Sequence, residues 1–145
     1  MERIGKIFKF MKEHDLPCIA IKDVYTIRYL TGFTGDSSIL YADDRIAVLV
    51  TDGRYIDQAR SELKYCRVQE YKGNIWETIA ELAGAHQKVG FDGDAFSYED
   101  AKALQAALTA TVEMVSVSLR TLRLIKDERE LESLWQASKI ADGAF

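Results

Sequence analysis

The chain has 145 residues, of which 48% are hydrophobic and 29% are charged, and its formal net charge is −4. This length suits one globular domain, and the aliphatic content excludes an intrinsically disordered chain. The sequence has no apolar run of about 18 residues that could span a membrane, and its net acidity argues against nucleic acid as the main partner.

The first half of the chain alternates between helical and strand-like patterns. Ile4, Ile7, Phe8 and Met11 recur at helical spacing and predict an amphipathic helix over 2–14. The lysines that interrupt this apolar pattern argue against a signal peptide. The elements expected after this helix are a buried strand at 16–21, a short helix or turn at 24–30 that closes at Gly32, strands at 38–41 and 45–50 separated by three residues, and a helix at 55–63. The short separation predicts that the two strands pair as an antiparallel hairpin.

The second half continues the alternation. Its expected elements are a strand at 66–71, a helix marked by Trp76, Ile79, Ala80 and Ala83, a strand at 88–92, a helix at 98–108, a strand at 111–117 and a helix at 127–145. Ser97 with Asp100, and Asp127 with Glu130, predict capping boxes at two of these helix starts. Strands and helices that alternate around one hairpin predict an α/β fold with a mixed, mostly parallel sheet and helices on both faces.

The last expected helix, 127–145, is apolar on two sides. Leu131, Leu134 and Trp135 share one face, and Ile140 lies on the opposite face. Such a helix needs cover on both sides. Two interpretations are open at this point: a C-terminal helix packed on the domain, or the first helix of a further domain.

The sequence offers no convincing catalytic centre. Cys18 and Cys66 lie in apolar strands without a CxxC motif or a nearby histidine, which indicates reduced, buried thiols of a cytoplasmic protein. His14 and His86 lie near helix ends, where the helix dipole stabilises a cation. We therefore expect no catalytic residue and no metal ligand in this chain.

Two loops remain as candidate binding sites. Gly32 and Gly35 flank Phe33 and are followed by Asp36, a pattern that we expect to hold the Phe33 ring out of the sheet. Arg54 follows the expected strand at 45–50, at a place where ligands commonly bind in α/β sheets. The alternative for both loops is a pair of tight turns, in which Asp52 caps the second turn and Arg54 pairs locally.

Four segments of the chain occur in the order and spacing of motifs from a known family. They are YLTGFTG at 29–35, TDGRY at 51–55, VGFD at 89–92 and LRLIKDE at 122–128. Together they resemble the creatinase/prolidase N-terminal domain, which precedes the catalytic domain of Xaa-Pro aminopeptidases and Xaa-Pro dipeptidases. The resemblance implies a mixed, mostly parallel six-stranded sheet of the ribonuclease H-like kind over 1–126. It also implies that 127–145 begin the first helix of a C-terminal catalytic domain with the pita-bread fold.

The resemblance implies a function as well. The chain would be the accessory domain of a cytoplasmic, homodimeric metallopeptidase, assisting dimerisation and covering the active-site cleft over a proline-containing peptide. Phe33, Asp36 and Arg54 would be the substrate-binding residues, in their own subunit or across the dimer. Two manganese, cobalt or zinc ions would be held by the C-terminal catalytic domain and none by this chain. The loop has no histidine of the kind found in the dipeptidase branch, which favours the aminopeptidase branch.

Two other functions stay open. The same architecture occurs in non-catalytic interaction modules, and in creatinase-like amidinohydrolases. The presence or absence of metal ligands in a following domain would discriminate between these possibilities.

Overall fold

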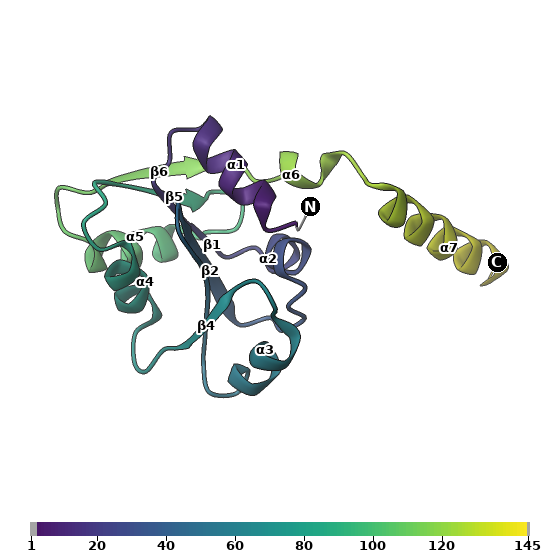
Figure 1. The fold of residues 1–145 in the computed structure, drawn as a ribbon, viewed down its shortest axis with the longest axis horizontal. Coiled ribbons are helices and arrows are strands. Elements are labelled where there is room, and N and C mark those ends of the chain that lie inside the picture. The colour runs from purple at the N-terminus through teal and green to yellow at the C-terminus, as the bar shows by residue number, and fades with distance from the viewer. Residues whose placement is uncertain (1–2, 145) are drawn as a thin grey trace.

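The computed structural model describes residues 3–144 and has one six-stranded sheet with the strand order β4-β3-β2-β1-β5-β6 (Figure 1). The strands are β1 (Cys18–Ile21), β2 (Ser38–Asp43), β3 (Ala47–Thr51), β4 (Arg67–Glu70), β5 (Lys88–Asp92) and β6 (Glu113–Val117). The helices are α1 (Gly5–Glu13), α2 (Val24–Thr31), α3 (Ile56–Glu62), α4 (Ile75–Ala83), α5 (Tyr98–Ala107), α6 (Thr121–Leu124) and α7 (Glu128–Ala144).

The strand pairing confirms the mixed, mostly parallel sheet. Strand β1 pairs parallel with β5, β3 with β4, and β5 with β6. The hairpin of β2 and β3 is antiparallel, as expected, and β2 also pairs antiparallel with β1. The hairpin register places Ser38, the first residue of β2, opposite Thr51, the last residue of β3.

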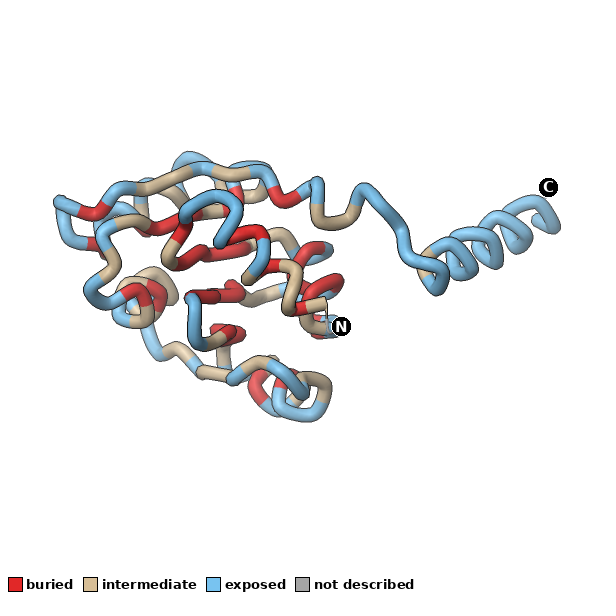
Figure 2. The backbone as a smooth tube through the Cα atoms, turned by 45° about the horizontal axis from the view of Figure 1, so that its top comes forward, coloured by how far each residue is buried: buried red, intermediate tan, exposed pale blue. Residues whose placement is uncertain are grey.

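Helices cover both faces of the sheet, and each face has its own apolar core. Residues of α1, α2 and α3, including Ile7, Ile27 and Ala59, form one core with the sheet. Residues of α4 and α5, including Ile79 and Leu104, form the other. Every residue of β1 and β3 is buried, because these central strands are covered on both sides (Figure 2).

Local sequence signals explain several helix boundaries. Ser97 and Asp100 form the expected capping box at the start of α5. The amide of Glu130 donates to Asp127, and the amide of Asp127 donates to Glu130, so the second expected box is confirmed at the start of α7. Two ends of expected helices, Glu2 and Phe145, lie outside the described residues.

Helix α7 does not pack on the sheet domain. It extends away from it (Figure 1), and none of the residues of Glu128–Ala144 is buried. The interpretation in which this helix packs on the domain is therefore wrong for the described residues. Helix α6, which precedes it, was not expected from the sequence. None of the helices in the described range 3–144 is both long enough and apolar enough to cross a membrane.

Candidate functional site

The two candidate loops meet at one end of the β2–β3 hairpin. The first loop, 32–37, leads into β2, and the second, 52–55, leaves β3, so the pairing of Ser38 with Thr51 brings them together. Thr51 Oγ1 donates to the Ser37 carbonyl oxygen over 2.6 Å, and Ser37 Oγ donates to Asp52 Oδ2 over 3.4 Å. The sequence placed both loops near strand ends, and the hairpin makes them one site.

Phe33 points into the core, and the expectation of an exposed ring is wrong. Its exposed fraction is 0%, and its ring meets the Tyr55 ring edge-on, with 6.3 Å between centroids. Gly32, at φ +84°, ends α2 in a left-handed conformation and redirects the chain. The redirected chain turns Phe33 inward, where burial of such a side chain stabilises the fold by about 1.5–3 kcal/mol.

Gly35 lets the loop lie directly on these two rings. A Cβ atom at this position would be 2.4 Å from Cζ of Phe33 and 2.9 Å from Cδ1 of Tyr55. Both distances are shorter than real carbon contacts, so only glycine fits without a shift of a packed ring. The loop is therefore supported from beneath by two aromatic side chains.

Asp36 and Arg54 lie on the outer side of this support, and Tyr55 links them. Tyr55 Oη donates to Asp36 Oδ1 over 2.5 Å, a hydrogen bond that raises the pKa of Tyr55. The Arg54 guanidinium lies 5.5 Å from the centroid of the same ring, and 74% of its side chain is exposed. An acid and a cation, 18 positions apart in sequence, are thus held at one exposed edge.

Arg54 also pairs locally, as the alternative interpretation of this turn predicted. Its Nη2 and Nε donate to the Asp52 carboxylate over 2.7 and 3.1 Å, and its backbone amide donates to Asp52 Oδ1 over 2.9 Å. These bonds lower the pKa of Asp52 to about 2. The pair fixes the direction of Arg54, and the guanidinium has five N–H donors in all, so some remain for another acceptor.

A second carboxylate, which was not expected from the sequence, supports the first loop. Thr34 donates to Glu62 through its amide (2.8 Å) and its hydroxyl (2.7 Å), and these bonds lower the pKa of Glu62. Gln58, one turn earlier in α3, donates to both Thr34 Oγ1 and Glu62. The i, i+4 spacing of Gln58 and Glu62 was a detectable signal, but Thr34, the partner of both, lies 28 residues before Glu62 in the chain.

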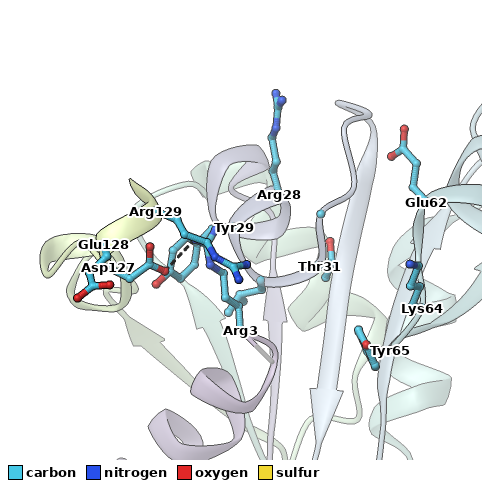
Figure 3. Close-up of a pocket in the computed structure, with 12 residues that line it drawn as sticks. Arg3, Arg28, Tyr29, Thr31, Glu62, Lys64, Tyr65, Asp127, Glu128 and Arg129 are labelled. Atoms are coloured by element: carbon cyan, nitrogen blue, oxygen red, sulfur yellow. Dashed lines mark hydrogen bonds and ion pairs between the residues drawn. The ribbon is translucent and has the colours of Figure 1, made fainter. Parts of the chain in front are cut away.

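An open hollow of about 860 Å³ adjoins this loop (Figure 3). The residues that line it come from the chain before α1, from the second half of α2, from the end of α3 and the segment after it, and from the start of α7; they include Arg3, Arg28, Glu62, Lys64 and Asp127. Its lining includes both basic and acidic side chains.

The described residues offer no metal centre. Within 3–144, no three His, Cys, Asp or Glu side chains lie close enough together to hold a metal ion. Both cysteines are free; Cys18 is buried and Cys66 is half-buried, and burial raises the pKa of each thiol to about 11. A manganese, cobalt or zinc pair therefore does not fit the residues described.

Comparison with known proteins finds a family model and related peptidases that match this chain. Residues 3–125 match the family model of the Creatinase/Prolidase N-terminal domain. The uncharacterized peptidase YqhT of Bacillus subtilis is 34% identical over 123 residues, which are 82% of this chain and 35% of the relative. The chain thus spans about a third of that relative's length.

Solved structures agree with the family match. An Xaa-Pro dipeptidase from Bacillus anthracis superposes on 100% of this chain and 41% of its own, with a TM-score of 0.91 and 29% identity. The N-terminal domain of cytoplasmic peptidase PepQ from Mycobacterium tuberculosis H37Rv has a TM-score of 0.76 and 31% identity, over 83% of this chain and 98% of its own.

Proposed function

This chain belongs to the creatinase/prolidase N-terminal domain family, and on that premise we propose that it is the accessory domain of a proline-specific metallopeptidase, an Xaa-Pro aminopeptidase or dipeptidase. The names of its relatives support this, since they include a peptidase and an Xaa-Pro dipeptidase. The whole enzyme would be a cytoplasmic homodimer.

The proposed domain boundary lies before α7. Residues 1–126 would form the accessory domain, and 127–145 would begin the C-terminal catalytic domain. The exposure of apolar residues on α7 supports this, because Leu131, Trp135 and Ile140 all lack cover in the described part of the chain. The two divalent metal ions of the enzyme would be held by that catalytic domain, where they would activate water for hydrolysis.

The role of this chain would be to bind the peptide substrate and to cover the active-site cleft. One observation carries the proposal: Asp36 and Arg54 converge on Tyr55 at an exposed edge whose backbone is fixed by Phe33 and Gly35. An exposed carboxylate can accept hydrogen bonds from a peptide ammonium group, and a guanidinium can donate to a carboxylate. We assign these contacts to Asp36 and Arg54, and to Phe33 only the support of the loop from beneath.

The test uses the full-length dimer and a proline-containing peptide. Arg54→Met and Asp36→Asn should each lower kcat/KM about tenfold, a loss of about 1.4 kcal/mol. Their melting temperatures should fall by at most a few degrees, because exposed pairs such as Arg54–Asp52 contribute little to stability. Arg45→Met is the matched control, because the Arg45 side chain is also largely exposed but lies at the opposite end of the hairpin. If Arg54→Met and Asp36→Asn both behave like the control, the cleft-covering role is refuted. If the full-length protein hydrolyses no Xaa-Pro bond with any divalent metal, the proposed peptidase activity is refuted.

A further inference from the structure

Few side chains of the segment between β6 and α7 pack against the domain. Leu119 is buried in the core of α1 and α2, and Leu122 packs against the same core. After them, Leu124 and Ile125 are largely exposed. Residues 124–126 therefore gain little from packing, and apolar contacts alone do not set the direction in which α7 leaves the domain.

An ion pair lies immediately before this exposed segment. Arg123 Nη2 donates to Asp23 Oδ2 over 3.1 Å. The same Asp23 oxygen caps α2 by accepting from the amide and hydroxyl of Thr26, and the Asp23 amide donates to Asp92 Oδ2. Arg123 thus binds a carboxylate that the helix cap already holds in place.

A second ion pair lies immediately after the segment. Arg3 Nη2 contacts Asp127 Oδ2 at 3.0 Å (Figure 3) and Glu130 Oε1 at 3.5 Å. These two acids form the capping box of α7. The Arg3 guanidinium also lies 4.7 Å from the centroid of the buried Tyr29 ring. The first turn of α7 is therefore tied to the N-terminal end of α1 and to α2.

From these contacts we infer that Arg123–Asp23 and Arg3–Asp127/Glu130 act together as a two-point ionic clamp that fixes the direction of α7 relative to the sheet. The clamp makes α7 a rigid arm, so that whatever follows it is held at a set angle and not on a free linker. The inference depends only on contacts within this chain and would survive the failure of the proposed peptidase role.

The superposition with the Bacillus anthracis structure supports a set direction, because it extends over the whole chain and includes α7. Ion pairs as exposed as these are individually weak and easily screened. A clamp built from two of them, one on each side of a three-residue segment, constrains direction better than either pair alone.

Residual dipolar couplings of backbone amides, in a neutral stretched gel, test the clamp on the 145-residue chain. In the unmodified chain, the couplings of α7 should fit the alignment tensor of the sheet amides. In Arg3→Met/Arg123→Met, the α7 couplings should fall by at least half while those of the sheet stay unchanged. Arg129→Met is the control, since it removes a positive charge from α7 and Arg129 has no ion pair among residues 3–144.

Two results would overturn the inference. One is an unmodified chain whose α7 couplings are already averaged relative to the sheet, and the other is a double variant whose α7 couplings equal those of Arg129→Met. If Arg123→Met disturbs the sheet amides, Arg3→Met alone decides the matter, because Arg3 is partly exposed and contributes little to the core. An α7 as ordered in Arg3→Met as in the unmodified chain would then refute the clamp.

Discussion

Replacement of Phe33 by alanine tests whether the first loop is built around a buried ring. Phe33 is fully buried and belongs to the core that α1 and α2 form with the sheet. Truncation of a buried Phe to Ala costs about 3–5 kcal/mol. A domain of this size loses roughly 3–4 °C in melting temperature per kcal/mol, so Phe33→Ala should melt about 10–20 °C lower.

Gly35 provides an independent test of the same contact from the other side. A Cβ at position 35 would overlap the Phe33 ring, so Gly35→Ala alone should cost about 1–3 kcal/mol. Phe33→Ala removes the atoms that this Cβ meets at 2.4 Å. The double variant should therefore lose less free energy of unfolding than the two single variants lose together. The difference, which is the coupling energy, should be about 0.5–3 kcal/mol.

Urea unfolding followed by far-UV circular dichroism measures all three variants. Tyr98→Ala is the matched aromatic control, because 77% of Tyr98 is exposed, and its free energy of unfolding should change by less than about 0.5 kcal/mol. Strict additivity of Phe33→Ala and Gly35→Ala, or a Phe33→Ala variant as stable as Tyr98→Ala, would show that the ring does not lie beneath the loop.

Three further predictions concern the turn, α7 and metals. In Arg54→Met, the Asp52 pKa should rise from about 2 toward its ordinary value of about 3.9, as carboxyl-carbon NMR titration would detect. Because the folded-state pKa is the lower one, Asp52 stabilises the fold above about pH 4 and loses this effect as the pH falls toward 2; an unchanged pKa in the variant would contradict the pairing. A chain that ends at Lys126 should unfold cooperatively within a few degrees of the 145-residue chain, and loss of two-state melting would place α7 in the core. Calorimetric titration of the chain with manganese or zinc should show no stoichiometric sub-micromolar site, and the chain alone should not hydrolyse Xaa-Pro peptides; either activity or tight binding would contradict the absence of grouped ligands among residues 3–144.

Much of the fold could be predicted because its signals are local. The hairpin follows from the short link between two apolar runs, and β5 occupies the expected residues, 88–92. The capping boxes at Ser97 and Asp127 depend on residues three positions apart. The alternation of these elements then indicates an α/β sheet without any knowledge of which strands are neighbours.

The direction of Phe33 could not be predicted, because it depends on residues far along the chain. A glycine on each side allows the ring to point outward or inward. The inward direction is favoured by Tyr55, which lies 22 residues later and offers the ring an aromatic partner. Glu62 was missed for the same reason, since its partner Thr34 becomes its neighbour only when β2 and β3 pair.

The strand order has a consequence for synthesis of the chain on the ribosome. Strands β1 to β4 are consecutive neighbours and can pair as they emerge, each with the strand made just before it. The other edge of β1 stays open until β5 is made, about 70 residues after it, as the pairing of Ile19 with Gly90 shows. During that interval, an apolar central strand presents unpaired backbone groups, a state prone to pairing with another chain. The nascent chain is therefore exposed to misassembly from the synthesis of β1 onward, and the arrival of β5 ends that period.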